Sequence, residues 1–130
     1  MSYHFSVNLR HDFDSVVERT RSELAEHGFG ILTEIDVRAT LKEKLGVDMG
    51  RYLILGACNP PFAHKAIMTD PAIGVLMPCN VVVREHDDGV LVDFMDPAVV
   101  LDLVKAPGVR DIADDVRTRL EMVRDALATG

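Results

Sequence analysis

The chain has 130 residues, of which 48% are hydrophobic and 27% charged, and its net charge is −7. This length fits a single domain over residues 1–130, and the composition excludes a disordered chain. The acidic charge argues against nucleic acid or an anionic membrane as the main partner, and no apolar stretch is long enough to span a bilayer.

The N-terminal residues and the cysteine count both bear on location. Residues 1–5 show neither the basic nor the apolar region of an export signal. Two cysteines are too few for a disulfide framework. We therefore expect a reducing, cytoplasmic setting.

In the first half of the chain, hydrophobic periodicity alternates between the two regular patterns. Alternation predicts strands over 3–9 and 31–37, and apolar residues three to four apart predict a helix over 13–27 between them. A short helix is expected over 38–45, ending before a glycine. Residues 51–58 are apolar on both faces, which predicts an inner strand of the sheet.

In the second half, a helix is predicted over 61–69, closed by Asp70-Pro71. Residues 73–77 and 81–86 are expected to be extended, with an interruption at Pro78. Asp88-Gly89 supplies a hairpin turn. The remaining elements are a strand over 90–95, a short helix from Pro97 to about Val104, and a long amphipathic helix over 109–127.

This order of elements predicts an α+β fold. We expect one compact domain with a mixed or antiparallel sheet of about five strands and helices mainly on one face.

The segment from Cys58 to His64 is the main candidate for a reactive or binding site. Cys58 lies where a strand ends and a helix begins, and a helix N-terminus lowers the pKa of a thiol. The thiol is then a candidate nucleophile, with His64 as its base. The alternative is that Cys58 is a small buried apolar residue and His64 a surface residue.

A second cysteine, Cys79, lies in a similar Pro-Cys-Asn sequence. If the two segments are neighbours in the sheet, the thiols of Cys58 and Cys79 face one site, where they form a reversible disulfide, bind a soft metal together or only pack. Their spacing matches no zinc signature, so no metal is predicted.

Charged residues outside these segments offer two more candidates. Glu34 and Asp36 project from the same face of one strand. They are either an acid–base pair or part of a solvated strand face. The segment 38–65 is locally basic, and Lys65 at its end is a candidate for holding an anionic small molecule. The alternative is again a solvated face.

Three segments, 28–37, 55–60 and 76–83, together resemble the family named domain of unknown function 302, DUF302. The resemblance covers nearly the whole chain. It implies a small cytoplasmic bacterial or archaeal α+β protein that forms a homodimer, and it implies no particular activity. It also implies one shared site that contains the residues matching the family pattern, which are Glu34, Asp36, Cys58, Asn59, Pro60, Pro78 and Cys79.

The leading hypothesis is therefore a small-ligand-binding or regulatory module whose site surrounds the Cys-Asn-Pro and Pro-Cys-Asn segments. The alternative is a thiol-based redox protein or enzyme that uses Cys58 with Cys79. Whether the chain is an enzyme, and with which cofactor, is left open. The residues assigned to ligand binding are Asn59, Pro60, Glu34, Asp36, Asn80 and Lys65.

Overall fold

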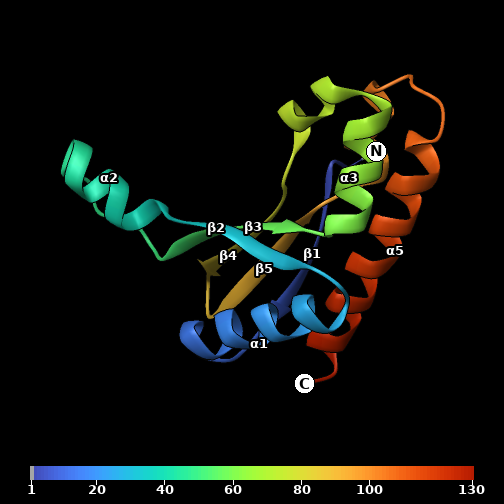
Figure 1. The fold of residues 1–130 in the computed structure, drawn as a ribbon. Coiled ribbons are helices and arrows are strands. Elements are labelled where there is room, and N and C mark those ends of the chain that lie inside the picture. Colours follow the sequence, from blue (N-terminus) through green and yellow to red (C-terminus); the bar gives the residue numbers. More distant parts are fainter. Residues whose placement is uncertain (1) are drawn as a thin grey trace.

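In the computed structural model, which describes residues 2–130, five strands form one sheet in the order β1-β5-β4-β3-β2 (Figure 1). The strands are β1 (His4–Leu9), β2 (Gly30–Asp36), β3 (Tyr52–Cys58), β4 (Cys79–His86) and β5 (Gly89–Met95). The α-helices are α1 (Phe13–Glu26), α2 (Val37–Leu45), α3 (Pro60–Thr69), α4 (Pro97–Val100) and α5 (Val109–Ala128). Two short 3-10 helices are η1 (Pro71–Leu76) and η2 (Leu101–Leu103).

The predicted α+β fold is confirmed, and every pair of neighbouring strands is antiparallel. One element was predicted wrongly. Residues 73–77 are not extended, because Asp70 caps η1 by accepting a hydrogen bond from the backbone N–H of Ala72 (3.1 Å). A short apolar run such as this one fits a strand or a buried helical turn equally well.

The core lies between one face of the sheet and the helices α1 and α5. Cross-strand pairing puts Leu55, Val81 and Phe94 in one row on this face, and all three are fully buried. The buried stripes of α1 and α5 pack against them. One sheet face thus supplies the side chains that hold both long helices.

The opposite face of the sheet carries the side chains that alternate with this row. Ile35, Ile54 and Val82 lie side by side there, on β2, β3 and β4. Within residues 2–130 none of these three side chains is fully buried. We call this the open face. Beside it, α2 and the loop after it stand away from the body of the molecule (Figure 1).

Candidate functional site

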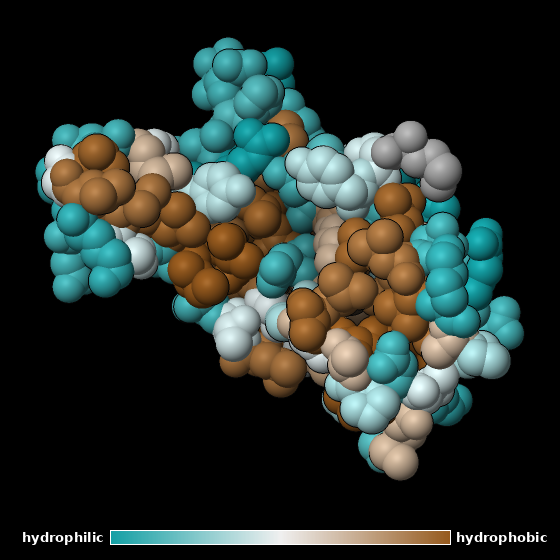
Figure 2. Space-filling model, turned by 90° about the horizontal axis from the view of Figure 1, so that it is seen from above, coloured by the Kyte–Doolittle hydropathy of each residue, from teal (hydrophilic) through white to brown (hydrophobic). Residues whose placement is uncertain are grey.

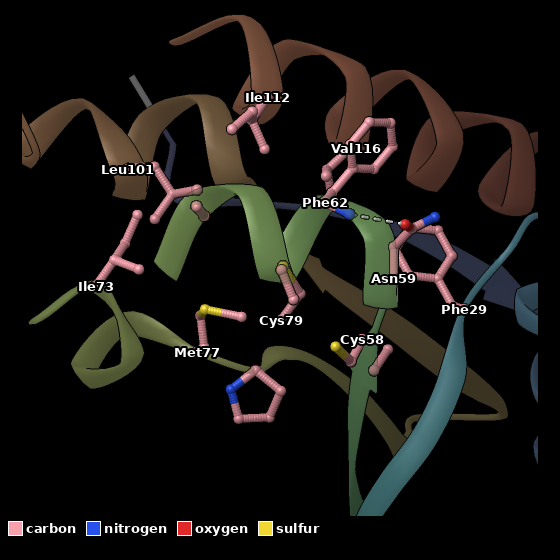
Figure 3. Close-up of a pocket in the computed structure, with 14 residues that line it drawn as sticks. Phe29, Cys58, Asn59, Phe62, Ile73, Met77, Cys79, Leu101, Ile112 and Val116 are labelled. Carbon is pink, nitrogen blue, oxygen red and sulfur yellow. Dashed lines mark hydrogen bonds between the residues drawn. The ribbon is translucent and has the colours of Figure 1, made fainter. Parts of the chain in front are cut away.

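A cavity of about 40 Å³ lies where the end of the sheet meets α3, α5, η1 and η2 (Figure 3). Its wall is almost entirely apolar and includes the thiols of both cysteines. The residues around it are Phe29, Ala57, Cys58, Asn59, Phe62, Ala63, Ala66, Ile73, Met77, Pro78, Cys79, Leu101, Ile112 and Val116.

The cavity lies at the junction of two apolar clusters. Ala57 and Val116 belong to the main core under the sheet. Ala66, Ile73 and Leu101 belong to a smaller cluster formed by the short helices at one end of the molecule. Side chains interdigitate closely within each cluster. Where the surfaces of the two clusters do not interdigitate, a gap remains between them.

The register of β3 and β4 brings the two cysteines together. Ala57 is directly opposite Cys79, so Cys58 is one residue beyond the pair. Figure 3 shows both sulfur atoms beside the same hollow, with the side chain of Met77 across from them. The two motifs that the sequence singled out therefore do meet at one cavity.

Both thiols hold their protons more tightly than a free cysteine. Burial raises the pKa of the Cys58 thiol above its usual value. Burial, and secondarily the charge that Cys58 would carry, raises the pKa of Cys79 to about 12. The predicted lowering of the Cys58 pKa by the start of α3 is therefore wrong. Asn59 is the N-cap, and its Oδ1 atom accepts the hydrogen bond of the Phe62 N–H (3.2 Å).

We expect the two cysteines to alkylate slowly and in a fixed order. In a pH series with iodoacetamide, Cys58 should react first, because its thiol is less deeply buried than that of Cys79. At neutral pH the thiolate fraction of Cys79 should be on the order of 1,000-fold below that of an unburied thiol. Peptide mass spectrometry of timed samples resolves the two sites. A Cys58 rate that is already maximal at pH 7 would contradict this expectation.

The other residues predicted near Cys58 lie around the start of α3. Asn59 is buried and lines the cavity. Pro60 begins α3, is exposed and does not line the cavity. His64 and Lys65 are also exposed and outside the cavity wall, so His64 is not placed beside either thiol there. The Lys65 ammonium lies 5.9 Å from the centre of the Phe62 ring.

Three further predicted site residues also lie outside the wall of the cavity. Glu34 pairs with Arg21 of α1. Asp36 caps α2 by accepting a hydrogen bond from the Ala39 N–H (2.9 Å). Asn80 follows Cys79 directly, so its side chain points to the open face of the sheet, away from the cavity. Strand alternation separates Asn80 from a motif that is continuous in the sequence.

Sequence reasoning missed most of the wall. Ile112 and Val116 were recognised as part of the apolar stripe of the last helix. That pattern does not distinguish residues that line a cavity from residues that are packed in the core. Ile73 and Met77 were assigned to an extended segment. The 3-10 helix η1, which Met77 directly follows, places both of them in the wall of the cavity instead.

Among residues 2–130, no three His, Cys, Asp or Glu side chains cluster so that they could hold a metal ion. Over the same residues, the structure contains no helix with the length and hydropathy needed to cross a membrane.

Comparison with known proteins finds a matching family and a similar solved structure. The model of the family "Domain of unknown function DUF302" matches residues 5–127. The chain belongs to the DUF302 family. A crystal structure of an uncharacterized conserved DUF302 protein from Bacillus stearothermophilus is similar, with a TM-score of 0.89 and 27% sequence identity. The match covers 96% of this chain and 98% of that DUF302 protein. No curated protein matches the sequence.

Proposed function

We propose that this DUF302 chain is a binding module for a small, uncharged, largely apolar molecule. The observation that carries the proposal is the wall of the cavity. Among the described residues, Asn59 is the one amide in it and no side chain with a formal charge lines it. A concave, mostly apolar site with a few polar groups is the usual form of a small-molecule pocket.

The protonation state of the two cysteines determines whether the cavity favours a charged or an uncharged ligand. With raised pKa values, both thiols are neutral at pH 7 and offer soft, weakly polar contacts. A carboxylate or phosphate would lose its hydration in this cavity without gaining a cation. Lys65 and Arg119 both lie near the Phe62 ring, so an anionic group would be held outside, at the rim.

The volume sets the size of the ligand. About 40 Å³ holds only a few heavy atoms, whereas an engineered cavity of about 150 Å³ binds benzene or xenon. Larger ligands require the wall to move. Met77 is the adaptable part of that wall, because a thioether side chain changes rotamer at little cost.

A thiol-based redox function has less support. No disulfide joins Cys58 and Cys79 in the structure, although both thiols line the same cavity, and the residue paired with Cys79 on β3 is Ala57. The raised thiol pKa values also disfavour a resting thiolate nucleophile.

We further propose that the protein acts in the cytoplasm as a homodimer, as the family resemblance implies. Both cysteines are free, which fits a reducing compartment.

The binding proposal is tested by methyl NMR with xenon and ethanethiol as probes. We expect saturable shifts confined to the methyl groups of Ile73, Leu101 and Ile112. Ala63→Leu should fill the cavity and raise the dissociation constant of each probe at least about tenfold. Ala72→Leu is the matched control, because Ala72 is exposed and outside the wall, and it should bind as the wild type does. Equal binding by both variants, or no saturable shift, would overturn the proposal.

A further inference from the structure

The open face of the sheet carries a hydrogen-bonded network of three side chains from three neighbouring strands. Ser6 of β1 lies opposite Asp93 of β5, and Arg84 of β4 is two residues from Val82, which lies opposite Asp93 on the other side. The Ser6 hydroxyl donates to Oδ1 of Asp93 (2.5 Å), and Nε of Arg84 donates to Oδ2 (2.7 Å). Both carboxylate oxygens are therefore occupied, and the Asp93 side chain is only 15% exposed.

The network holds the Arg84 guanidinium through Nε alone. Within residues 2–130, Arg84 makes no other hydrogen bond and no other ion pair. Its terminal nitrogens are not among the buried atoms of the described chain that lack a partner, so both are open to solvent. An edge of two such nitrogens forms two parallel hydrogen bonds with a carboxylate. Arg84 is thus fixed in place, with this edge free for a ligand.

Arg84 and Asp93 line a hollow of about 580 Å³, which is within the range of roughly 300–1,000 Å³ for small-molecule pockets. Val82 and Met95 contribute apolar surface to the hollow, and Tyr52, directly opposite Arg84 on β3, contributes an aromatic ring. Figure 2, in which α2 lies at the left as in Figure 1, shows apolar side chains from α2 toward the middle of the molecule, with polar ones beside them. The hollow therefore offers both a fixed cation and apolar contacts.

The charges in the hollow select the ligand. Among its described lining residues, Arg84 and Asp93 carry the only formal charges. A carboxylate on the terminal edge of Arg84 lies closer to the guanidinium than to Asp93, so the attraction exceeds the repulsion. A phosphate carries nearly two charges and would need a second cation to replace its hydration. Asn80 adds an amide to the same wall, which can donate to a carboxylate as well.

We infer that the open face binds a small monocarboxylic acid with an apolar or aromatic body. The terminal nitrogens of Arg84 hold the carboxylate, and the body of the acid lies against Val82 and Met95. Asp93 is a positioning residue, because it orients the guanidinium from the neighbouring strand. The hollow and the cavity share no lining residue, so a ligand here is independent of the function proposed for the cavity.

Methyl NMR on the full chain with benzoate as the probe tests this site. At millimolar concentrations we expect saturable shifts of the Val82 methyl groups and none at Ile73, which lines the cavity. Benzamide has the same ring without the charge, and it should bind the wild type at least about tenfold more weakly. This comparison uses no substitution, so it holds whatever a variant does to folding.

Variants then test the role of Arg84. Arg84→Gln should raise the dissociation constant of benzoate at least about tenfold, because the charged edge is lost. Arg124→Gln is the matched control. Nε of Arg124 also donates to a carboxylate, that of Asp125 (3.0 Å), and its side chain is 30% exposed against 31% for Arg84. Arg124 lies on α5 outside the hollow, so its variant should bind benzoate as the wild type does.

Several results would overturn the site. These are no saturable shift with benzoate, equal affinities for benzoate and benzamide, and equal affinities of the wild type and Arg84→Gln for benzoate. Shifts at Ile73 in place of Val82 would put benzoate in the cavity and overturn it as well. Tighter binding of phenyl phosphate than of benzoate would overturn the assignment to carboxylates. Xenon binding in the cavity is measured separately, so these results leave that test unchanged.

Discussion

Above pH 9, the free energy of unfolding should fall more steeply for the wild type than for a Cys79→Ala variant. The folded chain holds the Cys79 proton up to a pKa of about 12, whereas an unfolded chain releases it near the ordinary value. Because the unfolded state then binds fewer protons, stability decreases as pH rises through this window. The additional slope is at most about 1.4 kcal/mol per pH unit.

Urea denaturation at several pH values between 8 and 11 measures this slope. The tyrosines and lysines are the same in both proteins, so their contributions cancel in the comparison. Only the slopes are compared, since Cys79→Ala also removes packing. Cys79→Ser is a second variant without a titrating thiol and should give the same shallow slope. Parallel slopes for the wild type and both variants would mean that Cys79 titrates normally, and would return thiol chemistry to consideration.

The fold was predictable where local patterns carry strong signals. The helix over 109–127 was expected from one apolar stripe, and the structure buries that stripe in α5. The Asp88-Gly89 turn correctly predicted the hairpin of β4 and β5. These features depend on residues close together in the sequence, so periodicity and turn chemistry suffice.

The site was predictable only in part, because it depends on register and on the path of short helices. The similarity of the two cysteine motifs suggested that the segments are neighbours, and the pairing of Ala57 with Cys79 places them so. No sequence pattern showed that Asn80 would turn to the other face or that Met77 would close the cavity. The sequence left open whether Cys58 is an activated thiolate or a buried neutral thiol, because its position before a helix does not show that burial raises its pKa.

The exposure of α2 and of the loop that follows it, residues 37–51, is a further feature that the sequence did not reveal. The short helix over 38–45 was predicted at nearly its observed bounds, Val37–Leu45. Its apolar residues would ordinarily indicate burial in the same chain. Periodicity reports that a face is apolar but not which molecule covers it.

Replacing Asp96 by alanine should destabilise the protein by about 2 kcal/mol. Asp96 is buried, and its Oδ1 atom caps α4 by accepting a hydrogen bond from the Ala98 N–H (3.0 Å). Loss of such a cap costs about 1 kcal/mol. Its other carboxylate oxygen lies 3.4 Å from Nε of Arg117 on α5. That guanidinium is 43% exposed, so the lost ion pair adds no more than about 1 kcal/mol.

Asp96→Asn separates these two contributions in urea denaturation. The asparagine keeps an oxygen for the Ala98 N–H and loses only the attraction to Arg117, so it should cost about half as much as alanine. Equal losses for the two variants would contradict the capping role. The pair joins the segment that carries Leu101 to α5, which carries Ile112 and Val116, and these are facing walls of the cavity. Asp96→Ala should therefore also weaken xenon binding, because a cavity between two elements keeps its shape only while the contact that joins them holds.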